Sequence, residues 1–513
     1  MSKLSNVIFN WMDGSLFFRG LTAFLNFFKQ VAMGSFIVGF FTGEDTANGA
    51  RIGFFPWLAD KIFNGLPKPF KPPNDWFSGL SNLVKGSWLL STVANGLGTP
   101  IPLGVHRGKG GIKSALVWAF YALPVWLMAV VILTAPALPT MIVAGLLVPV
   151  LIFTILSRKV DINPLVITLL LFIGINFVAG FLSATPSSSI QIAMLVSLFM
   201  LTAVILPALI STRETVDFFF LVFLAGAGFA GIVGFYQFVA GYAGQVYVDV
   251  QTFGDIRFRI VSTLGNPNVY GMFLVLTTPI AAACVFFLKH PFLKLCSGGL
   301  TVLLVANVLL TYSRGSYLAL ALVIGVFVLM MEKRFVVLFI PALLAVPFLL
   351  PPAMLNRLLS IFDMTDTSAA FRVSIWRGSV RIIQDFWMSG IGQGAEAFNR
   401  IFPYYAPAAT FAEHSHNLIL QIMLELGIVG LIVFIGVLAC YFKIMVNFMR
   451  RQTELRLRMM AAAMISAVIG FLSQGMMDYV FYNFRLLLVF YIFLGLGIAF
   501  AKIYDKKGVQ ENA

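Results

Sequence analysis

The sequence is poor in charged residues, cysteine and histidine, and each shortage narrows the class of protein. Only 11% of its 513 residues are charged, whereas 59% are hydrophobic and the mean hydropathy is +0.92. Apolar runs long enough to cross about 30 Å of hydrocarbon recur along the chain. The composition therefore predicts an all-α, polytopic integral membrane protein.

The cysteines give no sign of cross-links or metal binding. Cys284, Cys296 and Cys440 lie in or beside apolar segments, without CxxC or Cys/His spacing. This pattern indicates neither a disulfide framework nor a zinc site, and we expect no metal or other cofactor. The first 30 residues also lack an apolar core followed by a small-residue cleavage site, so no cleavable signal peptide is expected.

The few charges are mostly positive, with a formal net charge of +14 and a pI near 9.7. A basic balance is also found in nucleic-acid-binding proteins. In a membrane protein, however, the basic excess gathers in cytoplasmic loops that face anionic lipid. We therefore expect membrane lipids as partners, and no nucleic acid.

About twelve apolar runs reach the length of roughly 20 residues that a membrane-spanning helix requires. Their expected limits are 115–135, 139–157, 164–183, 189–211, 217–239, 268–289, 295–311, 316–332, 335–352, 416–442, 457–477 and 481–502. The predicted architecture is thus a helical bundle with a large helical extracytoplasmic loop between the ninth and tenth spans.

The spans divide the chain into four regions. Residues 1–112 are rich in proline and aromatic side chains, and we expect a cytoplasmic or interfacial arm there. Residues 113–239 form an N-terminal transmembrane bundle, and residues 240–505 form a second membrane region that includes the external loop 353–415. Residues 506–513 form a cytoplasmic tail.

Lysine is missing from one side of the predicted membrane. The loops that carry lysine alternate along the chain, which places them and both termini in the cytoplasm. The opposite segments contain no lysine and nine arginines: Arg257, Arg259, Arg314, Arg357, Arg372, Arg377, Arg381, Arg400 and Arg485. Arginine presents a planar fork of donors that matches phosphate and carboxylate. We expect this face to hold an oxyanion, with pairing to nearby acidic residues as the alternative for any single arginine.

Three spans are expected to begin on the lysine-free side with a polar motif. The motifs are Asn266-Pro267, Ser313-Arg314-Gly315 and Ser415-His416-Asn417. Free backbone N–H groups at helix N-termini favour anions. We therefore expect the three helix starts to converge on one phosphate-bearing ligand, although ordinary capping explains each motif taken alone.

The external loop 353–415 is too long to be a simple connection. Arg377, Arg381 and Asp385 recur every four residues, which predicts an amphipathic helix at the membrane surface. A flexible turn is expected next, formed by Gly390, Gly392 and Gly394. We predict that the aromatic residues between 398 and 411 anchor the loop in the interface rather than stack on sugar rings.

Two of the four histidines, His414 and His416, stand directly before the tenth span, next to Glu413. Inside this span Asn417, Gln421 and Glu425 recur every four residues and share one helix face. Polar residues at that depth usually face a protein interior or a wet cavity. Other polar residues are expected near the same cavity: Gln474, Asp478 and Arg485.

Several of these motifs, in this order, resemble the O-antigen ligase and O-antigen polymerase superfamily of GT-C-type membrane glycosyltransferases. The motifs are Thr311 to Ser316, the Ser262 to Asn268 turn, the Arg372/Trp376 helix leading to Gly392 and Gly394, and His416-Asn417 before Glu425-Leu426-Gly427. Arg381 and Gly392 also fit the arginine, ten residues, glycine spacing of the polymerase branch. The resemblance covers roughly residues 240–495.

The resemblance implies a metal-independent, inverting glycosyltransferase of the bacterial cytoplasmic membrane, with its active site on the extracytoplasmic side. Its donor is an undecaprenyl-diphosphate-linked glycan, and its acceptor is a sugar hydroxyl on a glycan or on a second lipid-linked unit. His416 matches the family's outer-loop histidine and is the expected general base. Arg314 is the first choice for stabilising the diphosphate, followed by Arg257 or Arg259 and then Arg372, Arg377 or Arg381.

The remaining candidates have supporting roles. His414 is the second candidate for the base, Glu413 is expected to orient one of the rings, and Asn266, Asn417 and Glu425 are expected to support the site. A transporter or flippase of lipid-linked or anionic glycans is the alternative function, although it would distribute polar residues through the membrane depth. The sequence leaves the choice between ligase and polymerase open.

Overall fold

The computed structural model describes residues 163–210, 213–241, 258–331, 351–360, 367–406, 411–479 and 481–505, with isolated positions between 147 and 160 and between 340 and 348. Residue contacts divide the chain into two units, and the larger one includes residues 168–513. The arm predicted at 1–112, the expected span 115–135, most of the expected spans 139–157 and 335–352, and the tail 506–513 lie outside the described residues.

The regular elements of the described residues are all helices. Nine of these helices are long and apolar enough to cross a membrane. They are α9 (Pro164–Phe181), α10 (Pro186–Leu209), α11 (Arg213–Ala240), α13 (Pro267–Phe287), α14 (Pro291–Leu310), α15 (Arg314–Met331), α20 (Leu418–Arg451), α21 (Leu455–Gly475) and α22 (Phe484–Tyr504). Each corresponds to one of the expected spans, which confirms the all-helical class, while the total of about twelve stays a prediction.

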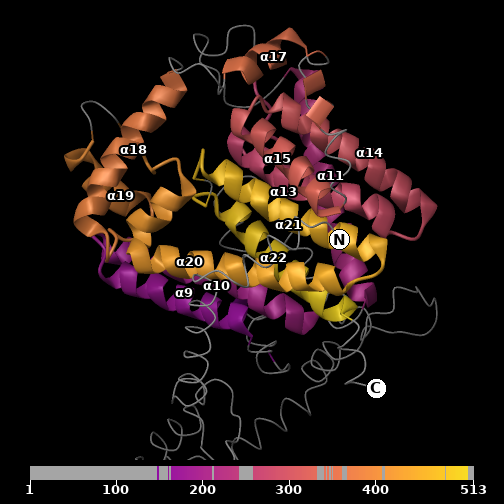
Figure 1. The fold of residues 1–513 in the computed structure, drawn as a ribbon. Coiled ribbons are helices and arrows are strands. Elements are labelled where there is room, and N and C mark those ends of the chain that lie inside the picture. The colour runs from indigo at the N-terminus through magenta and orange to yellow at the C-terminus, as the bar shows by residue number, and fades with distance from the viewer. Residues whose placement is uncertain are drawn as a thin grey trace, which may run out of the picture. The chain divides into compact units, whose positions relative to one another are not determined.

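Within the described residues, four further helical elements lie between α15 and α20. They are α17 (Pro352–Leu359), α18 (Thr367–Phe386), α19 (Ala395–Ile401) and the 3-10 turn η4 (Phe402–Tyr404). Helix α18 contains the predicted amphipathic segment and contacts α20. Both helices are labelled in Figure 1. The helical character predicted for this loop is therefore confirmed for its described part.

Local sequence explains where the helices start. Proline occupies the first helical position of α10, α13 and α14, where its missing N–H costs nothing. The side chains of Asn266, Asn417 and Asn483 accept backbone N–H groups at the starts of α13, α20 and α22. These caps confirm the capping predicted for Asn266.

Helices α13, α21 and α22 are largely buried within the bundle. Helix α13 packs against α14 and α21, α15 packs against α21, and α10 packs against α22. Small residues allow close approach where the bilayer provides no hydrophobic drive between helices. A Cβ at Gly271 would overlap the Ser316 hydroxyl, and one at Gly470 would overlap Val323. Substitution at either glycine would separate α13, α15 and α21, which carry the site described below.

Helix α20 is interrupted at Gly427, whose φ of 67° and ψ of −173° are not helical. The backbone groups around this kink bind the segment that follows α18. Ile391 N–H donates to Leu424 O at 2.7 Å, Gly392 N–H donates to Glu425 O at 3.2 Å, and Ile428 N–H donates to Trp387 O at 2.8 Å. Segment 387–394 therefore supplies the hydrogen bonds that the kink removes from the helix.

The three glycines of segment 387–394 lie in a stretch of turns and bends, as expected, and this stretch is closely packed. Gly390, Gly392 and Gly394 have φ values of 67°, 95° and 93°, which favour glycine. A Cβ on Gly392 would overlap the side chain of Ser183, and one on Gly390 would overlap the Glu425 carbonyl. The spacing of the glycines reflects close packing against the neighbouring helices.

Candidate functional site

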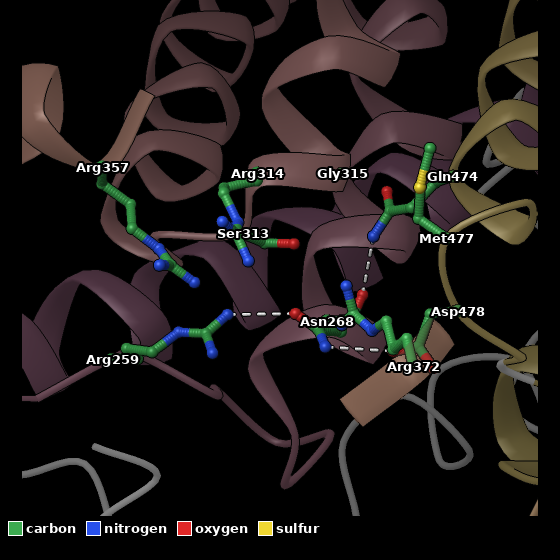
Figure 2. Close-up of a pocket in the computed structure, with 10 residues that line it drawn as sticks. All are labelled: Arg259, Asn268, Ser313, Arg314, Gly315, Arg357, Arg372, Gln474, Met477 and Asp478. Carbon is green, nitrogen blue, oxygen red and sulfur yellow. Dashed lines mark hydrogen bonds between the residues drawn. The ribbon is translucent and has the colours of Figure 1, made fainter. Parts of the chain in front are cut away.

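The starts of α13 and α15 open onto one pocket, beside the end of α21. Its volume is about 170 Å³, several times the roughly 30 Å³ that one water molecule occupies in the liquid. The residues that line it are Arg259, Asn268, Ser313, Arg314, Gly315, Arg357, Arg372, Gln474, Met477 and Asp478 (Figure 2). The pocket is therefore large enough for a diphosphate group.

The pocket lining is strongly cationic. Four arginines and one aspartate line it, which gives a formal charge of four minus one, or +3. The four arginines come from four places in the chain: the segment before α13, the start of α15, α17 and α18. Burial, and then the neighbouring charge of Arg357, lowers the pKa of Arg259 to about 9. Arg259 still carries its charge at neutral pH.

Hydrogen bonds hold three of the four pocket arginines in place. Arg259 donates to Thr311 O at 2.7 Å and to Asn268 Oδ1 at 3.0 Å. Arg314 donates to Ser360 O at 2.8 Å, and Arg357 donates to Tyr312 O at 3.3 Å. The positive charge therefore has a fixed position, which reduces the reorganisation needed when an anion binds.

Three residues near the site have positive φ although they are not glycine. Ser262, Tyr312 and His416 each have a φ of 50°, and among the described residues no other non-glycine does. They lie a few residues before the starts of α13, α15 and α20, respectively. Such conformations are uncommon and persist where surrounding contacts enforce them, often at functional sites. For Ser262, these contacts are hydrogen bonds to Gln237 and to Ala230 O.

His416 is paired with Asp478. His416 Nδ1 lies 2.9 Å from Asp478 Oδ1, and Asp478 Oδ2 accepts a hydrogen bond from Asn268 Nδ2 at 3.0 Å. Burial raises the pKa of Asp478, but the hydrogen bond and charge of His416, with Arg372, leave it below its usual value. An ionised Asp478 accepts a hydrogen bond from Nδ1–H of His416, which directs Nε2 of the ring away from the carboxylate.

The partner of the histidine differs from the expectation. We expected Glu413 to orient one of the rings, but its side chain is exposed, whereas Asp478 is buried beside His416. Asp478 also lines the cationic pocket. One carboxylate therefore connects the arginine cluster to the histidine.

His414 supports the loop that carries His416. Its Nδ1 accepts the backbone N–H of His416 at 3.2 Å, and the two ring centroids are 4.1 Å apart. Burial, and then the charge of His416, lowers the pKa of His414 to about 4. His414 is therefore neutral at physiological pH, with one ring nitrogen occupied by the loop backbone.

Gln421 and Glu425 act on the same loop from inside α20. Gln421 Oε1 accepts the backbone N–H of Ser415 at 2.7 Å, and Gln421 Nε2 donates to Glu425 Oε1 at 2.9 Å. The same carboxylate oxygen accepts the N–H of Gly394 at 3.3 Å. The side chain of Asn417 caps α20 and donates to Met476 O at 2.8 Å. Gln421, Glu425 and Asn417 do not line the pocket, so they support it indirectly.

The structure separates the candidate arginines. Arg314, Arg259 and Arg372 line the pocket, but Arg377 and Arg381 are exposed and do not. Arg257 lies outside the described residues. Arg485 donates to Thr263 O at 2.8 Å and does not line the pocket.

Only three of the ten lining residues, Arg259, Arg314 and Arg372, were among the predicted site residues, and Arg357 and Asn268 are two that were not. Arg357 comes from α17, and the sequence signal that marked it was the absence of lysine from the surrounding segment. Asn268 lies two residues after the predicted cap Asn266. Its side chain links Arg259 to Asp478, and its carbonyl accepts Gln474 Nε2 at 3.0 Å (Figure 2). The cap and the site residue are therefore separate members of one motif.

His414, His416 and Asp478 also form a set of donors that suits a metal ion. Their ligand atoms all lie within 4.8 Å of one another. Two imidazoles and a carboxylate are ligands that zinc accepts. Independence from metal therefore stays a prediction, and it requires a direct test.

The nine apolar helices and the cationic pocket define an integral membrane protein with an anion-attracting site at one end of its helices. Residues 299–435 match the family model described as O-antigen ligase, which supports the predicted resemblance to the O-antigen ligase and polymerase superfamily. The match includes Arg314, Arg357, Arg372 and His416. No curated protein matches the chain.

The family match supports the coarser functional predictions. Residues 299–435 indicate membrane glycan transfer of the O-antigen ligase or polymerase type. Lipid-linked glycans and membrane lipids are the partners that such a family implies. The individual donor, acceptor and residue roles are treated below as proposals.

Proposed function

We propose that the protein transfers a glycan from an undecaprenyl-diphosphate-linked donor to a sugar hydroxyl, in a metal-independent reaction that inverts the anomeric carbon. The observation that carries this proposal is the position of Asp478. It lines the arginine pocket and also holds His416, 2.9 Å from the ring nitrogen. A site for a diphosphate leaving group and a general base thus share one wall.

The arginine pocket binds the diphosphate of the donor. Guanidinium groups form bidentate bonds with phosphate oxygens and stay charged when partly buried. The starts of α13 and α15 add the positive ends of two helix dipoles. As the bond between the anomeric carbon and the diphosphate breaks, Arg259, Arg314, Arg357 and Arg372 stabilise the charge on the departing group.

His416 activates the acceptor. Its Nε2 takes the proton of the sugar hydroxyl while the hydroxyl oxygen attacks the anomeric carbon from the face opposite the diphosphate. Asp478 holds the tautomer with the proton on Nδ1 and stabilises the imidazolium that forms. Undecaprenyl diphosphate leaves with the bonding electron pair, and His416 then returns its proton to solvent.

The site belongs on the extracytoplasmic side of the bacterial cytoplasmic membrane in this proposal, with both termini in the cytoplasm. The support is the distribution of lysine, which is absent from the segments that carry the pocket arginines. On this side the enzyme meets a lipid-linked donor that has already crossed the membrane.

Purified full-length protein in lipid nanodiscs, supplied with a lipid-linked oligosaccharide, tests the proposal. A longer lipid-linked glycan identifies a polymerase, and glycan on a different acceptor identifies a ligase. His416→Ala and Arg314→Ala should each abolish turnover without unfolding the protein, whereas a chelator should have no effect. Wild-type rates in either variant would refute that residue's role, and loss of activity with chelator would refute the metal-independent mechanism.

A vesicle assay addresses the alternative function. If reconstituted protein moved the lipid-linked glycan across the bilayer without forming a new glycosidic bond, a transporter or flippase would be the better description.

A further inference from the structure

Three potential metal ligands meet between α20 and α21. His414 and His416 precede α20, and Asp478 follows the end of α21. One ligand atom from each residue lies within 4.8 Å of the other two. His416 Nδ1 and Asp478 Oδ1 are 2.9 Å apart, whereas two ligand atoms around a tetrahedral zinc ion are separated by roughly 3.4 Å. A change of about 1–2 Å in these separations therefore brings all three atoms to zinc-binding distances.

Neighbouring side chains hold two of these ligands from outside. Asp478 Oδ2 accepts a hydrogen bond from Asn268 Nδ2 at 3.0 Å, and the ring of His414 stacks on that of Tyr482 at 4.8 Å and 14°. Metal-binding imidazoles and carboxylates usually have such outer partners, which fix the direction of the ligand atoms. The side chain of His416 is 28% exposed, so an ion can reach the three residues from solvent.

The types of ligand select the ion. Imidazole nitrogen suits zinc and other late transition metals, whereas calcium and magnesium prefer oxygen ligands. Two imidazoles and one carboxylate form a three-ligand set that zinc accepts, with a fourth position left for water. These residues should therefore bind Zn²⁺ and discriminate against Mg²⁺.

We propose that His414, His416 and Asp478 bind Zn²⁺ as an inhibitory ion. The binding follows from the geometry alone, and the inhibition rests on the proposed function. Because Asp478 contacts His416 Nδ1, an ion bound between them takes the lone pair of Nδ1. The proton of the neutral imidazole then resides on Nε2. Nε2 has no lone pair left for the proton of a sugar hydroxyl, so zinc removes the general base by reversing its tautomer.

The surroundings favour an ion that binds reversibly. Asp478 lines the pocket together with four arginines, whose positive charge opposes the arrival of a further cation. His414 Nδ1 also accepts the backbone N–H of His416, and an imidazole that binds zinc through either nitrogen no longer accepts this hydrogen bond. Both effects lower the affinity for zinc, which agrees with a reaction that does not depend on a metal.

Zinc binding is measured on untagged full-length protein in phosphatidylcholine nanodiscs, after chelator treatment and removal of the chelator. Calorimetric titration with zinc chloride gives the affinity, and X-ray absorption at the zinc edge identifies the ligands. We expect a single ion with two imidazole ligands, which magnesium chloride does not displace. A zinc shell without imidazole, or displacement by an equal concentration of magnesium, would overturn the site.

A variant of His414 tests the assignment of the ligands. His414→Asn removes one imidazole and keeps the contact with the loop, because the amide oxygen can accept the His416 N–H in place of Nδ1. We expect zinc affinity to fall by more than about tenfold, since loss of even an outer partner of a metal ligand costs about 10–100-fold. His290→Asn is the matched control, because His290 is exposed and makes no side-chain cap hydrogen bond at α14, and it should bind zinc like the wild type. Equal affinities of wild type and His414→Asn would overturn the site.

Turnover separates the inhibition from the proposed function. Each protein is compared with its own zinc-free rate of glycan transfer. Zinc should lower the kcat of the wild type, and EDTA should restore it. The zinc concentration for half inhibition should be more than about tenfold higher in His414→Asn.

The other outcomes are distinguishable. Zinc that acts by binding the lipid-linked donor would inhibit wild type and His414→Asn equally, and this result would overturn the proposal. An unchanged or increased rate with zinc bound would refute the inhibitory role and leave glycan transfer standing. Zinc binding through two imidazoles, in a protein that forms no glycosidic bond, would support the site and refute the proposed function.

Discussion

The starts of α13 and α15 differ from the start of α20 in the side chains that they place at the candidate site, although a residue with positive φ comes shortly before each of them. Each is preceded by a residue with a φ of 50°. The first two place Asn268 and Arg314 in the cationic pocket, while the third presents a histidine paired with Asp478. In the proposed function, two helix starts therefore serve charge stabilisation and the third serves proton transfer. Asp478 takes part in both, because it lines the cationic pocket and pairs with His416.

The largest expected loss of activity is that of Asp478→Asn, which removes the carboxylate that links His416 to the cationic pocket. The amide no longer requires a proton on Nδ1, so the ring loses its fixed tautomer and Nε2 stops acting as the base. We expect kcat to fall by about 10²–10⁴-fold, the range of general-base catalysis. Single-turnover glycan transfer measures this loss. If Asp478→Asn retained more than about a tenth of wild-type kcat, the His416–Asp478 pair would not be the base.

The arginines of α18 provide the second comparison because they share one helix. Arg372→Ala should lower kcat/KM by about 10²-fold, the range seen for removal of one donor from a transition-state site. Arg381→Ala is the matched control, since Arg381 is exposed and does not line the pocket, and it should stay within twofold of wild type. Equal losses in the two variants would show that α18 binds the donor through its general charge and not through Arg372.

A glycine substitution in segment 387–394 tests the packing role of this segment, because its effect is on stability and not on the chemical step. Gly392→Ala places a methyl group on Ser183 and forces a φ of 95° on alanine. We expect a loss of about 1–3 kcal/mol in stability. Gly299→Ala in α14 is the control, since nothing lies within 4 Å of the added carbon, and it should be neutral or slightly stabilising. Thermal unfolding in detergent compares the two, and equal shifts would contradict the packing role.

His414 gives the smallest expected effect, and it depends on pH. Burial lowers its pKa from 6.5 to about 4, so the unfolded chain binds the proton more readily than the folded protein. Stability should therefore fall as the pH drops from about 6.5 towards 4, by roughly 1–3 kcal/mol, and should be constant above 6.5. His414→Gln removes the titrating group, so its unfolding temperature should vary less across this range. Parallel pH profiles for the two proteins would contradict a buried, neutral His414.

Much of the fold follows from the sequence because membrane-spanning helices are long and strongly apolar. All nine long helices of the described residues coincide with expected spans. The convergence of polar helix starts was also predictable, since helices that begin on the same side of a membrane place their N-termini at the same level. Arg314 could be assigned to the site for this reason.

The arrangement of the loop between α15 and α20 could not be obtained in the same way. The sequence indicates that Arg372, Arg377 and Arg381 share an amphipathic helix, but which of them faces the pocket depends on how that helix docks. This docking is set by the kink at Gly427 and by backbone hydrogen bonds from segment 387–394. Such bonds leave no side-chain pattern. The pairing of His416 with Asp478, 62 residues apart, depends likewise on the packing of α20 against α21.

The kink at Gly427 has a consequence for the order in which the protein is assembled. Unpaired backbone groups inside a bilayer cost several kcal/mol each, so α20 cannot reach its final form in lipid until Trp387, Ile391 and Gly392 are in place to bind it. These residues precede α20 in the chain and therefore leave the ribosome first. The partner that completes the helix is thus already synthesised when the helix inserts, and no later element of the chain has to arrive before the kink is satisfied.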